Sequence, residues 1–163
     1  MFKLFKKYFQ DLSDDEILSL SIDTLEEDIR LYDDYSSHFL INYPETSKMF
    51  KKMSILKNKN RQQLINLYKK KFGETLSITN KKEISNFFKR KPQWFVIKNS
   101  IEKVRNEIIE MEAISSQFYN SFAKKSNNIE IRNLLIDLAM MSREQKDNAK
   151  LILLNAQKLQ SAK

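Results

Sequence analysis

The sequence predicts an all-α protein of four long helices, arranged as two helical hairpins that a long crossover joins. Three observations lead to this prediction. The 163 residues include one glycine and two prolines, which leaves few turn residues for a fold with many strands. Four stretches carry apolar residues at spacings of three and four, the period of an α-helix. Residues 73–99 separate the second stretch from the third, as a crossover between two hairpins would.

The first predicted helix runs from about Asp14 to Leu40. Ser13 and Glu16 have the spacing of a capping box, in which each residue satisfies a free backbone N–H group of the other. One face of this helix is formed by residues three and four apart, which are Leu18, Ile22, Leu25, Ile29 and Tyr32.

The second predicted helix runs from about Glu45 to Phe72. Pro44 directly precedes it and Gly73 directly follows it, and these are the residue types favoured at the start and the stop of a helix. Its inner stripe interrupts apolar residues with two polar ones and consists of Phe50, Met53, Lys57, Asn60 and Leu64.

The crossover, the third helix and the fourth helix follow in that order. A short helix in the crossover has a cap signal at Asn80 and Glu83, and Pro92 and Trp94 stand at the crossover's end. The third helix covers roughly Ser100 to Lys124, and the fourth begins near Asn127, with Glu130 three residues on, and runs to about Gln157. Their inner stripes are Val104, Ile108, Glu112, Ser115, Tyr119 and Phe122, and Leu135, Leu138, Ser142, Gln145, Ala149 and Ile152.

Length and composition limit the classes of protein that remain. We expect residues 1–12 to form a short basic, aromatic N-terminal segment and residues 13–163 to form a single domain. The chain has no cysteine, which excludes disulfides and thiolate chemistry, and its single histidine is His38. No apolar run reaches a membrane span and no secretory signal is visible, so we expect a cytoplasmic protein.

The net charge of +8 raises the question of an anionic partner. The lysines are scattered and form no nucleic-acid motif, which favours a solvated surface. In the N-terminal segment, Phe2, Phe5 and Phe9 alternate with Lys3, Lys6 and Lys7. This segment could lie on an anionic membrane, or its aromatic side chains could dock on the bundle or on a partner subunit.

Several segments, in this order along the chain, resemble one known family. They are Glu26–Tyr32, Asn42–Pro44, Arg61–Tyr68, Lys71–Glu74, Phe87–Trp94, Met111–Glu112 ahead of Phe118–Tyr119, and Leu134–Ala139. Together they resemble the rubrerythrin-like domain of the membrane-bound ferritin (iron-exporter) family from about Leu12 to Leu154. The resemblance implies a ferritin-like four-helix bundle that holds two iron ions and is usually dimeric.

The ligand positions of that family fall on six residues of this chain. The glutamates of the first and third helices fall on Leu25 and Glu112. The two Glu-x-x-His motifs fall on Lys57 with Asn60 and on Ser142 with Gln145, while Tyr32 and Tyr119 are expected beside the site. The chain departs from the pattern at all of these ligand positions except Glu112. We therefore predict a degenerate site without metal.

Neighbouring residues do not obviously replace the missing ligands. Glu26, Glu27 and Asp28 are carboxylates, but we expect rotation of about 100° per residue to turn them away from the face of Leu25. Lys57 and Glu112 fall on the inner stripes of different helices. We expect either a buried ion pair between them, with Asn60, Gln145, Ser142, Tyr32 and Tyr119 completing its hydrogen bonds, or a Lys57 side chain that reaches the surface.

These observations predict a ferritin-like, rubrerythrin-related protein with a structural, regulatory or binding role rather than catalysis, and with no cofactor. The alternative is an iron-handling ferroxidase or peroxidase-like protein that binds iron through displaced carboxylates. A basic module for membranes or nucleic acid is a third hypothesis. We expect a homodimer, and a protein partner is possible. The aromatic residues expected outside the stripes are Tyr35, Phe39, Phe87, Phe88 and Trp94.

Overall fold

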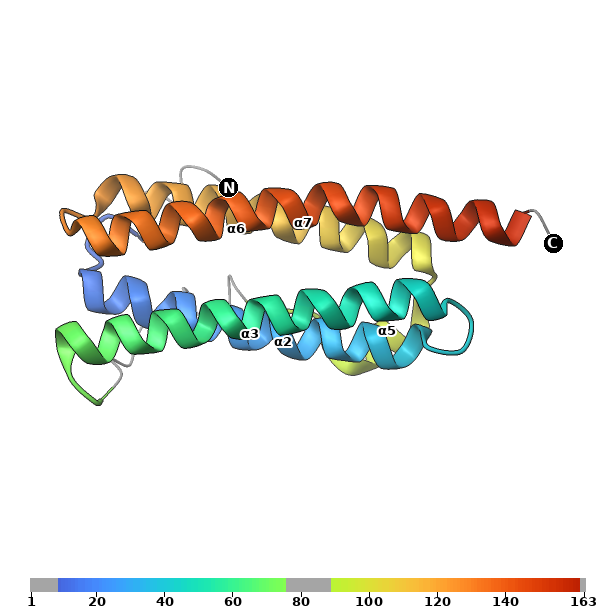
Figure 1. Cartoon of the computed structure of the whole chain (residues 1–163), viewed down its shortest axis with the longest axis horizontal. Coiled ribbons are helices and arrows are strands. Elements are labelled where there is room, and N and C mark those ends of the chain that lie inside the picture. Colours follow the sequence, from blue (N-terminus) through green and yellow to red (C-terminus); the bar gives the residue numbers. More distant parts are fainter. Residues whose placement is uncertain (1–8, 76–88, 162–163) are drawn as a thin grey trace.

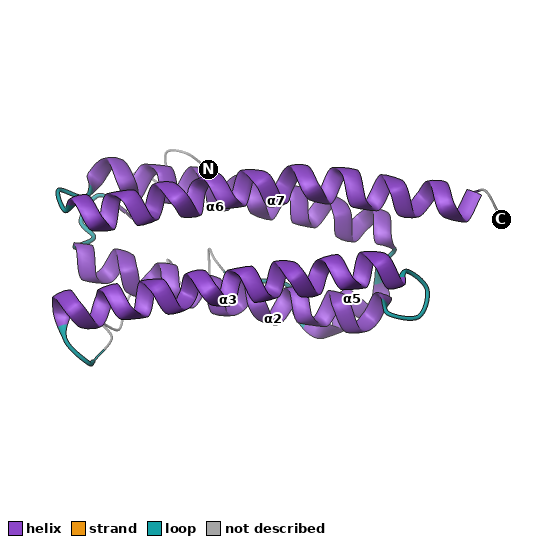
Figure 2. Ribbon diagram, viewed as in Figure 1, coloured by secondary structure: helices purple, strands orange, loops and turns teal. Residues whose placement is uncertain are grey.

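The computed structural model describes residues 9–75 and 89–161, with the backbone alone from residue 152 onward. The described residues form helices and no strand (Figure 2). The helices are α2 (Asp14–Phe39), α3 (Pro44–Phe72), α5 (Gln93–Lys98), α6 (Ile101–Lys125) and α7 (Ile129–Ser161). The all-α prediction is confirmed, and the four long helices agree with the predicted ranges to within a few residues.

The ends of the first two long helices follow the predicted signals. The backbone N–H of Ser13 donates to the Glu16 carboxylate at 2.9 Å, which is half of the predicted capping box. Helix α3 begins at Pro44, whose missing N–H is not needed in the first turn. Gly73 ends it with a φ of 95°, a left-handed conformation that residues with a Cβ rarely adopt.

The last two helices are also capped by side chains. The Ser100 hydroxyl accepts a hydrogen bond from the N–H of Lys103 at 3.3 Å. Helix α7 is capped by Asn128, one residue later than the predicted Asn127, because the Asn128 side chain accepts from the N–H groups of Glu130 and Ile131. The cap predicted for the crossover, at Asn80 and Glu83, lies outside the described residues.

Two helical hairpins make the bundle. Helix α2 packs along α3, and α6 packs along α7 (Figure 1). In this view α3 ends at the left and α6 begins at the right, so the connection crosses the length of the bundle. The short helix α5 belongs to this crossover and packs on α2. The predicted arrangement of two hairpins and a crossover is confirmed.

The core consists of two apolar clusters with a polar layer between them. One cluster includes Leu25, Leu64, Phe118 and Leu138, and the other includes Leu31, Phe50, Ile108 and Ala149. Along each long helix, the polar positions of the inner stripe separate the two clusters. We call these side chains the central polar layer, which consists of Asp28, Lys57, Glu112, Ser115, Ser142 and Gln145.

The aromatic residues expected outside the stripes do not form one group. Tyr35 and Phe39 are buried in the second cluster, because steps of three and four from Tyr32 keep them on the inner face of α2. Trp94 is 61% exposed, as expected, whereas Phe87 and Phe88 lie outside the described residues. Tyr35 and Phe39 therefore cannot contribute to an outer surface.

The N-terminal segment reaches the bundle at Phe9. This ring is buried and packs edge-on against Phe118 and Phe122, with centroid distances of 6.0 and 5.5 Å. Docking on the bundle is confirmed for this residue, while Phe2, Phe5 and the lysines among them lie outside the described residues. No described helix is both long enough and apolar enough to cross a lipid bilayer.

Candidate functional site

A buried ammonium group lies at the centre of the polar layer. The Nζ atom of Lys57 is 2.9 Å from Asp28 Oδ2 and 2.9 Å from Glu112 Oε1, so it joins α3 to both α2 and α6. All three side chains have no exposed area. The ion pair predicted between Lys57 and Glu112 is therefore confirmed, and the alternative in which Lys57 reaches the surface is wrong.

The second carboxylate, from Asp28, lies inside the bundle, so the prediction that it turns away from the face of Leu25 is wrong. One residue of an α-helix turns the side chain by about 100°, so three residues turn it by about 300° and bring it back to about 60° from its starting point. Asp28, three residues after Leu25, thus returns to the inner face, whereas Glu26 is exposed. The spacing of three residues between Leu25 and Asp28 is the feature of the sequence that indicates the inward position of Asp28.

A second buried cation comes from the crossover. Arg90 is 8% exposed, and its Nε donates to Asp28 Oδ1. Its terminal nitrogen donates to the Ser115 hydroxyl of α6 at 3.0 Å. Two cations and two carboxylates therefore balance in charge inside the bundle, as buried charges require. Arg90 was not predicted, because a residue in an irregular connection belongs to no helical stripe.

Burial opposes the ionisation of Asp28 and Lys57, but the opposite charges beside each of them favour it more strongly. Burial alone raises the pKa of Asp28, but the charges of Arg90 and Lys57 bring that pKa below its ordinary value. Burial lowers the pKa of Lys57, and the carboxylates of Asp28 and Glu112 more than compensate, so it rises above its ordinary value. Asp28 and Lys57 are thus held in their charged forms together.

The two tyrosines expected beside the site behave differently. The Tyr32 hydroxyl donates to Glu112 Oε1 at 2.6 Å, and burial together with this carboxylate raises the pKa of Tyr32 well above its usual range. Tyr119 is also buried, but its hydroxyl has no hydrogen-bond partner among the described residues. The structure brings Tyr32 into the ion cluster as predicted and leaves Tyr119 unpaired.

The remaining predicted residues lie inside the bundle but do not complete the ion pair. Leu25 is fully buried in the apolar cluster, and the Asn60 amide donates to the sulfur of Met141. Ser142 and Gln145 lie one turn apart on the inner face of α7. Ser142 has no exposed area, and Gln145 is 2% exposed. Their polar side-chain atoms have no partner among the described residues, so the prediction that they hydrogen-bond to the pair is not supported.

The unpaired amide of Gln145 leads to a testable expectation. A buried polar group without a partner is unfavourable by about 1–3 kcal/mol. We expect Gln145→Met, which keeps the length of the side chain, to raise the free energy of unfolding by about 1 kcal/mol in urea titrations. Gln62→Met, at an exposed position of α3, is the matched control and should have little effect. A clear loss of stability in Gln145→Met would show that this amide is paired.

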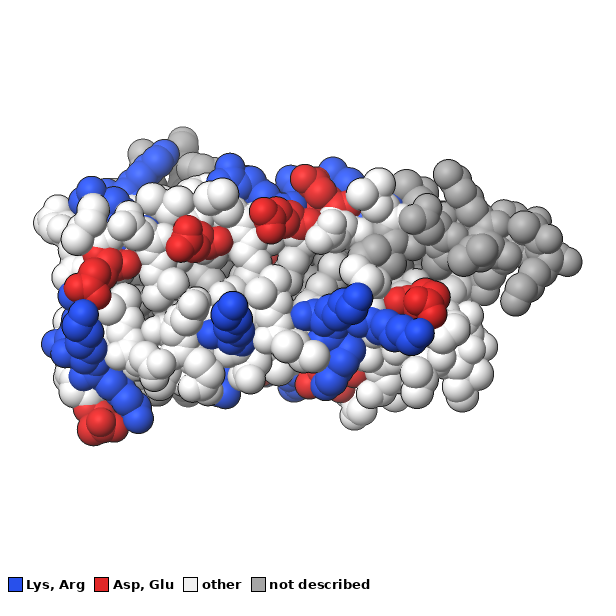
Figure 3. Space-filling view, in the orientation of Figure 1, with Lys and Arg blue, Asp and Glu red and all other residues white. Residues whose placement is uncertain are grey.

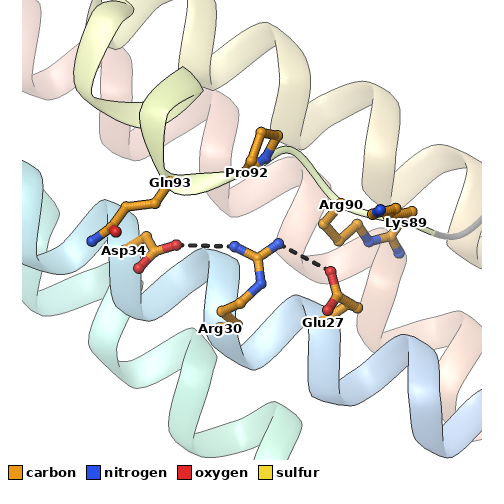
Figure 4. Close-up of a pocket in the computed structure, with 7 residues that line it drawn as sticks. All are labelled: Glu27, Arg30, Asp34, Lys89, Arg90, Pro92 and Gln93. Atoms are coloured by element: carbon orange, nitrogen blue, oxygen red, sulfur yellow. Dashed lines mark hydrogen bonds and ion pairs between the residues drawn. The ribbon is translucent and has the colours of Figure 1, made fainter.

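A polar hollow of about 360 Å³ lies above the cluster, between α2 and the start of α5 (Figure 4). Its central cation is already neutralised, because Arg30 binds Glu27 and Asp34 at 3.0 Å each. Arg90 lines this hollow and also reaches Asp28, so it separates the buried cluster from the surface. The hollow is lined by Glu27, Arg30, Asp34, Lys89, Arg90, Pro92 and Gln93.

No group of three or more His, Cys, Asp or Glu residues with the proximity needed to hold a metal ion occurs within residues 9–75 and 89–161. The cluster contains two such residues, Asp28 and Glu112, and the ammonium of Lys57 lies between them. An arrangement of this kind can hold three helices and the crossover in one register. It offers no free base or nucleophile at the centre.

The chain is similar to known proteins in its sequence and in its fold. A family model described as Rubrerythrin matches residues 16–150. A solved structure, the hypothetical protein Pfu-1136390-001 from Pyrococcus furiosus, has a TM-score of 0.70 with 17% sequence identity, covering 91% of this chain and 95% of that chain. At this identity the likeness concerns the fold alone. A search of curated proteins found no significant match.

Proposed function

The chain belongs to the rubrerythrin family, and we propose that it is a ferritin-like protein with a degenerate di-iron site and a non-catalytic structural, regulatory or binding role. The observation that carries the proposal is the Lys57 ammonium, held 2.9 Å from each of two buried carboxylates at the centre of the bundle. A ferritin-like di-iron site places glutamates and two Glu-x-x-His motifs at this centre.

The residues present do not fit two iron ions. A protonated lysine has no lone pair to coordinate a metal, and its charge repels a cation. The two carboxylates that remain, Asp28 and Glu112, are already neutralised by Lys57 and Arg90. We infer that the ion cluster takes over the structural part of the metal's role, which is to tie the inner faces of the helices together.

Metal content after anaerobic loading with ferrous iron tests the proposal. We expect the purified chain to retain no iron above the level of a blank after removal of the excess, as measured by elemental analysis. A variant with the ligand set of the resemblance, Leu25→Glu, Lys57→Glu, Asn60→His, Ser142→Glu and Gln145→His, is the matched positive control. Stoichiometric iron in the unaltered chain would instead support the iron-handling alternative, with Asp28 as a displaced ligand.

We also propose that the protein acts as a homodimer. The surface that could form such a dimer follows from the distribution of charge on α3 and α7.

A further inference from the structure

The lysines of α3 other than the buried Lys57 divide into two groups. Five of them have acidic partners within the chain, namely Lys48, Lys51, Lys69, Lys70 and Lys71. Lys52 and Lys59 have none within the described part of the chain. The acidic residues of α7 divide in the same way. Glu130 and Asp147 are paired, whereas Asp137 and Glu144 are exposed and have no ion-pair partner among the described residues.

The unpaired charges lie on the neighbouring edges of α3 and α7. Seven residues are almost two turns of helix, so Lys52 and Lys59 share one edge of α3 and Asp137 and Glu144 share one edge of α7. Lys70, eleven residues after Lys59, lies within about 20° of that edge around the helix axis. Lys70 binds Glu130, which is seven residues before Asp137, so these edges are the neighbouring ones.

Figure 3 shows this face of the molecule. Acidic side chains run along α7 and basic side chains run along α3, with uncharged atoms between them. Leu56 is 40% exposed on α3, and Met140 is 49% exposed on α7. We call this surface, with Lys52, Leu56, Lys59, Asp137, Met140 and Glu144, the acid–base face.

The acid–base face is complementary to itself. A two-fold axis parallel to the helices would place the basic edge of α3 on the acidic edge of α7 in the other copy, twice over. A two-fold axis in the same plane but across the helices would bring α7 against α7 and α3 against α3, and like charges would repel. The charge pattern therefore selects the axis as well as the surface.

The register between the helices identifies a specific contact. The Asn60 side chain meets Met141, and α3 runs antiparallel to α7, so Lys59 stands level with residue 142. An axis parallel to the helices preserves this level in the other copy. Glu144 of the other copy is then displaced from Lys59 by about 3 Å along the helix axis, well within reach of a lysine side chain.

The size of the face suits a stable association. From Ile129 to Leu151, α7 presents about 34 Å of helix at 1.5 Å per residue. Two neighbouring helices, each roughly 10 Å across, give a face of about 700 Å², close to the roughly 800 Å² per partner of a standard-size interface.

We propose that the acid–base face is the surface through which two copies of this chain associate, about a two-fold axis parallel to the helices, with Lys59 of one copy paired with Glu144 of the other. The occupant is a second copy rather than an unrelated protein, because the face carries both charge rows in the order that its own rotated image requires. This inference rests on the proposed homodimer and does not depend on whether the bundle binds iron.

Charge reversal and charge exchange test this interface in the full chain by sedimentation equilibrium. We expect the unaltered chain to be a dimer that dissociates more readily as salt rises. Lys59→Glu and Glu144→Lys should each weaken the dimer by at least about tenfold, because each places like charges opposite one another twice. The double variant Lys59→Glu with Glu144→Lys should recover most of the lost affinity.

Lys124→Glu is the control, since it changes the net charge equally from an exposed position on α6, which does not border this face. We expect it to leave the dimer unchanged. A monomer at all concentrations, a dimer that both single variants leave intact, or a double variant that remains as weak as the single ones would each overturn the proposal. Thermal melts check that the variants, all at exposed positions, remain folded.

Discussion

Replacement of Lys57 by methionine is expected to lower the free energy of unfolding by about 3–5 kcal/mol, the range seen when one partner of a buried ion pair is removed. The Lys57 ammonium binds two carboxylates that have no exposed area. Without it, Asp28 keeps Arg90, but among the described residues Glu112 keeps only the hydroxyl of Tyr32. Methionine preserves most of the aliphatic volume, so the effect reports the charge rather than a cavity.

Urea titrations of Lys57→Met and of two companion variants measure this effect. Lys48→Met on the same helix breaks a largely exposed pair with Glu45 and should lower the free energy of unfolding by at most about 1 kcal/mol. The double variant Lys57→Met with Glu112→Gln should recover much of the loss, because glutamine removes the unpaired charge and still accepts from Tyr32. A small loss in Lys57→Met, or no recovery in the double variant, would contradict a buried ion cluster.

Replacement of Arg90 by methionine is expected to have the next largest effect, a loss of about 3 kcal/mol. Its guanidinium is the second cation on Asp28 and also donates to Ser115 of α6 at 3.0 Å. Because Arg90 lies just before α5, its loss should also free the crossover from α2. We expect faster amide hydrogen exchange in Gln93–Lys98, the residues of α5, together with the lower stability.

Arg30→Met is the matched control for Arg90→Met. Arg30 also connects the crossover to α2, since it donates to the carbonyl of Lys91 and binds Glu27 and Asp34. Its side chain is 37% exposed, so its ion pairs should contribute at most about 1 kcal/mol. Equal losses in the free energy of unfolding for Arg30→Met and Arg90→Met would show that the burial of Arg90 does not increase its contribution to stability.

The helices could be predicted because their signals are local. The cap at Ser13 and Glu16, the proline at Pro44 and the glycine at Gly73 each act within a turn of helix, and the structure places the ends accordingly. The inner stripes were predictable for the same reason, since the period of the helix alone decides which side chains meet. Lys57 and Glu112 were recognised because charged residues stood where the period demands burial.

The full composition of the site could not be predicted in the same way. Asp28 lies three residues after Leu25, and the helical angle places i+3 nearly as well as i+4 on one face. Arg90 could not be found by periodicity, because the position of a residue within a long crossover depends on the tertiary packing of that crossover. The hydrogen bonds expected for Asn60, Ser142 and Gln145 depended on side-chain distances that a stripe does not specify.

The balance of charge among Asp28, Lys57, Arg90 and Glu112 has an evolutionary consequence. A lineage with this interior could not acquire metal binding one substitution at a time without passing through unstable proteins. A change of Lys57 to glutamate would set three carboxylates beside the single charge of Arg90. Until the remaining ligands and a metal ion were in place, every such intermediate would bury uncompensated negative charge. A buried ion cluster of this kind is therefore a feature that selection for stability tends to preserve.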